Sequence, residues 1–267
     1  MQKIKSLAKD HMPSKLLKVA MNQYFNIKGL IYANSYAGDA VKCPCCGKTF
    51  RAFMDFQCSE IHDKIHFSNY TKNIHCPRCF SLPRHRIVCN YLNENREILE
   101  NNVNILMFGA EFAIERWFKK NNYAYSSADL FDRTADLKED IQNISFPDES
   151  WSVIFCNHVL EHVPDYHLAL KELYRILKKG GILELTVPTN KNSDVTHEDL
   201  SKLPPQERTR LFGQDDHLRI FGNDIKESIV DAGFSVKVID GDGLPPIFRT
   251  GIGPANYDDN RVYICQK

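Results

Sequence analysis

The stretch Asp148-Glu-Ser-Trp-Ser-Val-Ile-Phe-Cys-Asn-His-Val-Leu-Glu-His162 decides the fold. It follows a Phe-Pro turn, and its apolar, partly β-branched run from Trp151 to Cys156 is typical of a strand buried on both faces. After that run the composition becomes polar and ionisable. Ligands of open α/β sheets bind in the crevice at the carboxyl ends of the strands. We therefore expect working groups at Asn157, His158, Glu161 and His162.

The composition describes an ordinary globular chain of 267 residues, of which 43% are apolar and 25% charged. This length suits one large domain and a small one. Lys+Arg and Asp+Glu both number 34, so there is no global positive charge for nucleic acid. The sequence has no transmembrane-length apolar run and no signal peptide, which predicts a cytoplasmic protein. Nine cysteines in that setting indicate metal binding or free thiols before disulfides.

Strand and helix patterns alternate outward from the central stretch. Apolar runs predict strands at residues 103–108, 123–127, 182–187, 234–239 and 261–265, with a third strand end or loop at 136–141. Helical spacing predicts helices at residues 87–99, 112–120, 167–179 and 224–232. Gly180-Gly181 is predicted to end the helix at 167–179, and Gly233 the helix at 224–232. This alternation indicates an α/β fold with a parallel, doubly wound sheet.

Two C-P-x-C knuckles, Cys43-Pro-Cys-Cys46 and Cys76-Pro-Arg-Cys79, precede that domain. Two such turns complete a tetrahedral site, and four thiolates leave no open position, so we expect structural zinc. The 29 residues between the pairs predict a small inserted hairpin or loop at about 53–73. Cys45 competes with Cys46 as a ligand. Weaker alternatives are Cys58, His62, His66 and His75.

The predicted organisation has three parts: a basic helical segment at 1–42, a zinc-binding module at 43–86 and the large domain at 87–267. The first segment is either a solvated helix packed on the main body or a basic surface helix touching anionic lipid or RNA. Ser81-Leu-Pro-Arg-His-Arg86 either holds an anion or is a linker whose arginines pair with nearby acids.

The first strand of the large domain is followed by features that suit an adenosine cofactor. Gly109 supplies a tight turn, and Asp129 follows 20 residues later, where an acid would bind ribose hydroxyls. Asp140 and Ile141 lie where a third-strand loop would cover an adenine.

Three ordered segments then carry a resemblance. They are Asp140-Ile-x-x-Ile-x-Phe-Pro-Asp-x-Ser-Trp-x-Val-Ile, Asn157-His-Val-Leu-Glu-His-Val163 and Leu168-Ala-Leu-x-Glu-Leu-Tyr-Arg-Ile-Leu-Lys-Lys-Gly-Gly181. With the closing Ala232-Gly-Phe-Ser-Val-Lys-Val, the region from about 100 to 267 resembles the class I S-adenosylmethionine-dependent methyltransferases, type 11 group. The paired knuckles resemble a subgroup of bacterial methyltransferases with an N-terminal zinc module. The resemblance implies a Rossmann-like seven-stranded sheet whose last strand is antiparallel, and in-line attack on the sulfonium carbon.

The resemblance also implies site residues. Asp129, with Leu130 beside it, would hold the ribose, Asp140 would face the adenine, and Asn157 and His158 would close the methionine side. The family's first turn usually carries an acid followed by G-x-G-x-G, whereas this chain has Met107-Phe-Gly-Ala-Glu111. Ala110 keeps the turn tight, and Glu111 either meets the cofactor's amino group or is a plain surface residue.

The acceptor site is expected within residues 190–222. His217 could take a proton from a hydroxyl. Arg219 could hold a carboxylate or phosphate of the acceptor, and Asp216 is a second candidate for binding the acceptor. A salt-bridged loop is the alternative. Glu161 and His162 either take part in catalysis or serve packing and capping, and 241–260 is predicted to form a lid.

The leading hypothesis is a methyltransferase with S-adenosylmethionine and structural zinc, acting on a small-molecule or saccharide-like acceptor, at oxygen. The sequence does not give the acceptor or the oligomeric state. One alternative is an RNA methyltransferase whose zinc module reads RNA through Arg78, Arg84, His85, Arg86 and the N-terminal lysines. The other is a non-catalytic binding protein that has lost the cofactor.

Overall fold

A six-stranded sheet forms the centre of the computed structural model, which describes residues 12–57, 70–100, 103–241, 244–245, 248 and 261–267. The strand order is β11-β12-β8-β7-β5-β6. The strands are β5 (Ile105–Phe108), β6 (Ser126–Ala128), β7 (Trp151–Asn157), β8 (Leu177–Thr186), β11 (Ser235–Asp240) and β12 (Arg261–Gln266). Strands β6, β5, β7 and β8 run parallel, whereas β12 is antiparallel to both β8 and β11. The predicted α/β sheet with an antiparallel last strand is therefore confirmed.

The resemblance implied seven strands, and the described residues place six in this sheet. At the expected third strand, only one bridge forms, between Ala128 and Leu137. Asp136 accepts hydrogen bonds from the backbone and hydroxyl of Ser127, at 3.0 and 2.7 Å. Asp140 then turns the chain back by bridging Asn143. Polar contacts and this turn leave one paired position instead of a strand.

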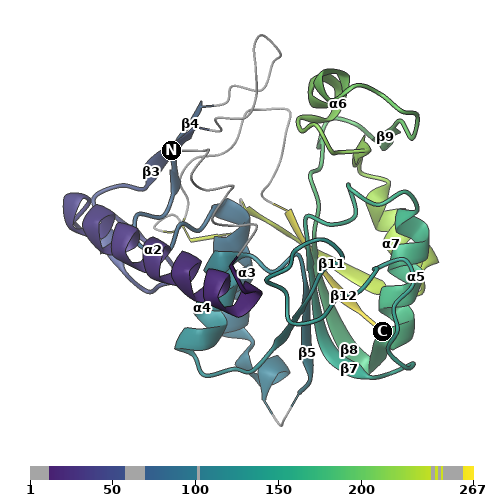
Figure 1. Cartoon of the computed structure of the whole chain (residues 1–267), viewed down its shortest axis with the longest axis horizontal. Coiled ribbons are helices and arrows are strands. Elements are labelled where there is room, and N and C mark those ends of the chain that lie inside the picture. The colour runs from purple at the N-terminus through teal and green to yellow at the C-terminus, as the bar shows by residue number, and fades with distance from the viewer. Residues whose placement is uncertain (1–11, 58–69, 101–102, 242–243, 246–247, 249–260) are drawn as a thin grey trace.

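Helices cover both faces of the sheet (Figure 1). α3 (Pro83–Glu94), the 3-10 helix η1 (Arg96–Leu99) and α4 (Phe112–Lys120) contribute to one core, and α5 (Tyr166–Ile176) and α7 (Ile225–Asp231) to the other. Successive strand residues serve opposite faces: Val153 and Phe155 join the α3/α4 core, while Ile154 and Cys156 join the α5/α7 core. The central strand is thus buried on both faces, as its apolar run predicted.

The end of α5 differs from the prediction. The helix ends at Ile176, and Leu177 already pairs with Trp151 in the sheet. The register between β7 and β8 then shifts, because Val153 pairs with Ile182. Gly180, at φ +73°, turns the chain inside this irregular segment. The two glycines therefore shape a bulge within β8 and do not end the helix, whereas Gly233, at φ +112°, follows α7 as predicted.

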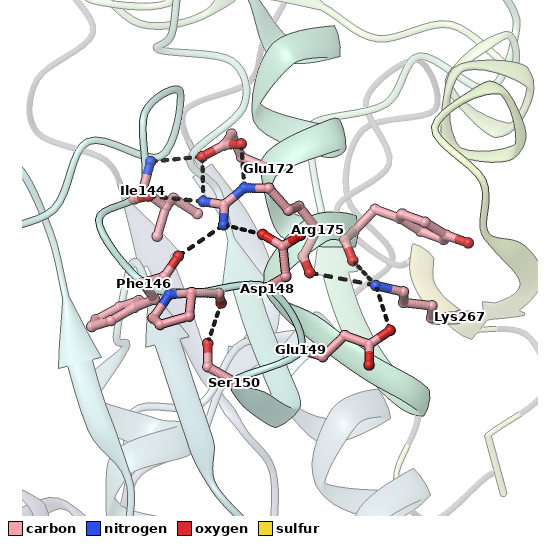
Figure 2. Close-up of polar contacts among 10 residues, drawn as sticks. Ile144, Phe146, Asp148, Glu149, Ser150, Glu172, Arg175 and Lys267 are labelled. Atoms are coloured by element: carbon pink, nitrogen blue, oxygen red, sulfur yellow. Dashed lines mark hydrogen bonds and ion pairs between the residues drawn. The ribbon is translucent and has the colours of Figure 1, made fainter.

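The loop before β7 is fixed by Arg175 of α5 (Figure 2). Its guanidinium donates to the carbonyl oxygens of Ile144 and Phe146 and pairs with Asp148, each at 2.8 Å. Glu172 holds the same guanidinium from within the helix, at 2.8 Å. This network sets where the central strand begins.

The N-terminal part contains a long helix and two hairpins. The elements are α2 (Ser14–Ser35), β1 (Val41–Lys42), β2 (Thr49–Phe50), β3 (Met54–Gln57) and β4 (Tyr70–His75). The β3–β4 pair confirms the predicted inserted hairpin, whose tip lies outside the described residues. α2 packs on the main body and approaches the second knuckle so closely that a Cβ on Gly29 would lie 2.2 Å from the carbonyl oxygen of Arg78. Among the described helices, none is long and apolar enough to cross a membrane.

The segment between β8 and α7 forms a small unit beyond the carboxyl ends of the strands (Figure 1). It contains β9 (His197–Glu198), α6 (Pro205–Phe212) and β10 (Arg219–Ile220), with β9 and β10 paired antiparallel. The backbone N–H of Leu218 donates to the carbonyl oxygen of Glu161 at 2.9 Å, which ties this unit to the loop after β7. Most of the predicted lid at 241–260 lies outside the described residues.

Candidate functional site

The turn after β5 requires glycine. Gly109 has φ +62°, and a Cβ there would lie 2.3 Å from the carbonyl oxygen of Asn157 and 2.9 Å from a methyl carbon of Val159. The first turn therefore presses against the end of β7, which brings backbone from two adjacent strands together at the edge where ligands bind.

We expect Gly109→Ala to lower the free energy of unfolding more than Gly213→Ala does. Gly213 also has positive φ, +86°, but a Cβ there meets nothing within 4 Å. Each variant carries the left-handed backbone strain of roughly 1–2 kcal/mol, and only the first adds the collision. Urea titrations of both variants measure the difference. Equal losses would show that the turn relaxes freely.

A cavity of about 140 Å³ lies beside this turn. Ala110 and Asp129 line it from the ends of β5 and β6, and α2 lines it with Lys18, Met21 and Phe25. Oδ1 of Asp129 accepts the backbone N–H groups of residues 131 and 132, each at 2.7 Å. These bonds orient the carboxylate at the end of its strand. A helix packed on the main body was one prediction for this segment, but its place at the cavity was not predicted.

The other predicted cofactor residues occupy neighbouring strand ends. Oδ1 of Asn157 accepts the hydroxyl of Thr186 at 2.7 Å, and His158 adopts φ +51°. Asp140 accepts the backbone N–H of residue 142 at 2.9 Å, whereas Ile141 is buried in the α5/α7 core. Leu130 follows Asp129 and is 36% exposed. Their positions follow from the sheet order, which brings the ends of β6, β5 and β7 to one edge.

Glu111 is held by the helix that follows the second knuckle. Its carboxylate pairs with Arg84 at 2.5 Å and with Nε2 of His85 at 2.6 Å. Burial alone would raise the pKa of Glu111, but Arg84 and His85 outweigh it and hold the pKa well below its usual range. Glu111 is therefore not the plain surface residue that was one prediction. Arg84 follows the prediction that the linker arginines pair with nearby acids.

Arg86 does not form part of a surface basic patch. It is 1% exposed and donates to the carbonyl oxygens of Ile74 and Ser81 at 2.6 and 3.2 Å. His85 is also buried. Of these two side chains predicted for an RNA-reading patch, Arg86 instead joins α3 to the segment around the second knuckle, and His85 pairs with Glu111.

Glu161, His162 and His217 come together after β7. One ligand atom of each lies within 4.8 Å of the others. Nδ1 of His162 lies 3.3 Å from Oδ2 of Asp216, and Nδ1 of His217 donates to the carbonyl oxygen of residue 212 at 3.1 Å. Burial lowers the pKa of His217. Burial raises the pKa of Glu161, but His158 more than offsets it, so the net shift is downward.

Arg219 does not reach an acceptor, which corrects the sequence prediction. It is fully buried and donates to Glu198 at 2.5 Å. Its remaining donors bind the carbonyl oxygens of Leu160, Val163 and Pro164 at 2.5–3.0 Å. A fully buried guanidinium that uses four of its five N–H donors in this way supports the loop and is not placed to bind an external anion.

Glu184 is a buried acid that the sequence analysis missed. It lies in β8 opposite Phe155 and is 2% exposed. Burial raises its pKa to about 8, although Asn157 opposes the shift. The alternating pattern of this strand places residue 184 at a core position. An acid at a core position is the one signal in the sequence that could have identified it.

We expect Glu184→Gln to stabilise the protein more at pH 8 than at pH 5. The unfolded chain ionises near 4.5 and the folded chain near 8, so the folded state binds the extra proton and stability falls as pH rises through this window. Between pH 4.5 and pH 8, the stability gained by Glu184→Gln relative to wild type should grow by at most about 1.4 kcal/mol per pH unit. Thermal unfolding at both pH values measures it, with exposed Glu227→Gln as control. Parallel pH profiles for wild type and Glu184→Gln would contradict the assignment.

The predicted cysteines also come together. Sγ of Cys43 lies 3.6 Å from Sγ of Cys79, and Sγ of Cys46 lies 3.8 Å from Sγ of Cys76, with all four within 4.8 Å. Cys45 instead points its thiol at the carbonyl oxygen of residue 85, at 3.2 Å. Cys46, and not Cys45, belongs to the group of four thiols. Four convergent, mostly buried thiols fit a tetrahedral zinc ion; Cys58, His62 and His66 lie outside the described residues.

Comparison with known proteins agrees with this arrangement. Residues 84–236, more than half of the chain, match the family described as "Methyltransferase domain". The chain belongs to this methyltransferase family. Among solved structures, the [4+2]-cyclase SpnF superposes with a TM-score of 0.50 at 16% identity, covering 68% of this chain and 81% of that one, which supports the Rossmann-like fold.

Curated relatives match the methyltransferase over short segments. Demethylmenaquinone methyltransferase from Geobacillus sp. is 44% identical over 50 residues, and that from Staphylococcus epidermidis is 43% identical over 53. These segments cover 18% and 19% of this chain, and 21% and 22% of the relatives.

The residues present fit S-adenosylmethionine. Gly109 lets the turn after β5 pack against the end of β7, and Asp129 presents a carboxylate at the cavity beside this turn. Glu111 supplies an acid next to the same turn, although it is shared with Arg84 and His85.

Proposed function

We propose that this protein transfers a methyl group from S-adenosylmethionine to an oxygen of a small-molecule or saccharide-like acceptor. The observation that carries the proposal is the strand-end arrangement in which the obligate glycine turn at Gly109 adjoins a cavity bearing Asp129. Family membership supports the reaction type. The relatives named demethylmenaquinone methyltransferases support a small acceptor.

The chain's own residues would divide the cofactor between adjacent strand ends. Backbone at Gly109 and Ala110 would approach its methionine part, Asp129 would accept hydrogen bonds from its ribose, and Asp140 and Ile141 would border its adenine. Asn157 and His158 would close the methionine side. The bound cofactor supplies an electrophilic methyl group on a sulfonium, so positioning accounts for much of the rate.

The acceptor would lie toward the cluster Glu161, His162 and His217. It stands after β7, at the crevice edge, and Asp216 orients one of its imidazoles. Imidazole side chains suit the handling of a hydroxyl proton, because they can both accept and donate one. Arg219 supports this loop from behind instead of binding the acceptor.

We also propose one structural zinc ion held by Cys43, Cys46, Cys76 and Cys79. The converging thiols support it, and four thiolate ligands leave no open position for chemistry. Its role would be to fix the two knuckles against α2 and α3.

We expect S-adenosylmethionine to bind the zinc-replete protein, and Asp129→Ala to weaken binding at least 10-fold. Loss of a charged hydrogen-bond acceptor to the ribose typically costs roughly 1.5–3 kcal/mol, which corresponds to this factor or more. Isothermal titration calorimetry measures it, with exposed Glu227→Ala on α7 as the matched control. Absence of heat for wild type at millimolar cofactor would overturn the methyltransferase proposal and favour a binding protein that has lost the cofactor.

A further inference from the structure

Two protein segments bring Glu161, His162 and His217 to one point. Glu161 and His162 lie in the loop after β7, and His217 lies just before β10. The two segments are joined by a hydrogen bond of 2.9 Å from the backbone N–H of Leu218 to the carbonyl oxygen of Glu161. One ligand atom of each side chain lies within 4.8 Å of the others. The two histidine rings stand edge to face, with centroids 4.8 Å apart.

Glu161 is a buried carboxylate whose donors are incomplete. It is 0% exposed, and His158 Nδ1 forms an ion pair with Oε1 at 3.0 Å. Beyond that ion pair, neither carboxylate oxygen has a hydrogen-bond partner among the described residues. Burying a carboxylate is costly unless paired charges and donors compensate it, so a bound cation would offset part of this cost.

Each imidazole has an acceptor oxygen facing its Nδ1 atom. Nδ1 of His162 faces the carboxylate of Asp216 at 3.3 Å, and Nδ1 of His217 faces the carbonyl oxygen of Phe212 at 3.1 Å. A neutral ring that donates its Nδ1 proton carries its lone pair on Nε2. Carboxylate or carbonyl partners behind a ligating histidine are the usual outer support of metal sites.

We propose that Glu161, His162 and His217 bind a divalent transition-metal ion, distinct from the zinc of the cysteine cluster. Two imidazoles and one carboxylate favour Zn²⁺, Fe²⁺ or Co²⁺ over Ca²⁺ or Mg²⁺. Bonds of about 2.0–2.2 Å require the three ligand atoms to close inward. The side chain of His162 is 33% exposed, so it has room to move and leaves an entry path.

Three protein ligands leave at least one coordination position open. If the proposed methyl transfer to oxygen holds, an acceptor hydroxyl oxygen is the group placed to fill that position, and the ion would lower the pKa of that hydroxyl. His217 is then a ligand and not the general base. This consequence rests on the proposed function, whereas the metal site itself does not.

The test is a Co²⁺ titration of the full chain after its cysteine cluster has been saturated with Zn²⁺. Wild type should bind one further equivalent with visible d–d bands and no thiolate charge-transfer bands. His162→Gln and His217→Gln should each weaken this binding more than roughly 100-fold. Asp216→Asn, which removes only the outer partner, should weaken it roughly 10–100-fold. His167→Gln, an exposed histidine on α5, should bind as wild type does.

The proposal is overturned if wild type binds no further equivalent of Co²⁺, or if His162→Gln and His217→Gln bind it as tightly as wild type does. Circular dichroism identifies a variant that has failed to fold. In that case the wild-type spectrum and the Co²⁺ affinity of Asp216→Asn decide the outcome, because the Asp216 side chain is 64% exposed. S-adenosylmethionine calorimetry on the same samples separates the two hypotheses, because cofactor binding without the second metal retains the proposed function and loses only this site.

Discussion

Replacing Cys76 with serine is expected to remove one zinc ion per chain and to destabilise the protein by several kcal/mol. Structural zinc contributes folding free energy directly, because the site does not exist in the unfolded chain. The cysteine cluster is also part of the α3/α4 core, in which Cys43 and Cys76 lie with Phe53, Ile87 and Trp117. Loss of the metal should therefore loosen α3 and its contacts as well as the two knuckles.

The measurements are zinc content by mass spectrometry and thermal unfolding with and without a chelator. Cys89→Ser is the matched control, since Cys89 is equally buried in the same core but lies outside the four-thiol group. The control should keep its zinc and its chelator sensitivity. Retention of zinc by Cys76→Ser, or equal zinc loss in Cys89→Ser, would refute a four-cysteine site.

The strand-end residues were predictable because the sheet order follows from the sequence of patterns. Gly109, Asp129 and Asn157 each follow an apolar run, and parallel strands bring their carboxyl ends to one edge. The cysteine knuckles were predictable for a similar reason, since each pair is local. Only the choice between Cys45 and Cys46 needed the structure, because it depends on which thiol points toward the other knuckle.

The acceptor side was less predictable because burial there inverts the usual pattern. His217 and Arg219 are buried while Leu218 between them is not. A polar segment of this kind predicts an exposed loop with free charges, yet the carbonyl groups of the loop after β7 draw Arg219 inward. The predicted end of α5 was wrong for another reason. Leu177 satisfies both the helical and the strand pattern, and only its pairing with Trp151 assigns it to β8.

Arg219→Met is expected to lower the free energy of unfolding by roughly 3–5 kcal/mol, although it replaces a charged side chain with an apolar one of similar length. The cause is what the guanidinium leaves behind. Glu198 loses its buried partner, and the carbonyl oxygens of Leu160, Val163 and Pro164 lose their donor. The stability of Arg219→Lys should lie between those of wild type and Arg219→Met, because an ammonium keeps the charge but lacks the planar fork that reaches several acceptors.

Urea unfolding measures these losses, with Arg210→Met as control. Arg210 also pairs with a glutamate, Glu207, but on the exposed face of α6, where such a pair contributes little. The two substitutions remove the same chemical group, so their difference isolates burial. A small loss for Arg219→Met, together with phosphate stabilising wild type but not this variant, would restore the anion-binding role that the sequence predicted. A large loss without any phosphate effect would mean that Arg219 acts by holding the loop on which Glu161 and His162 stand.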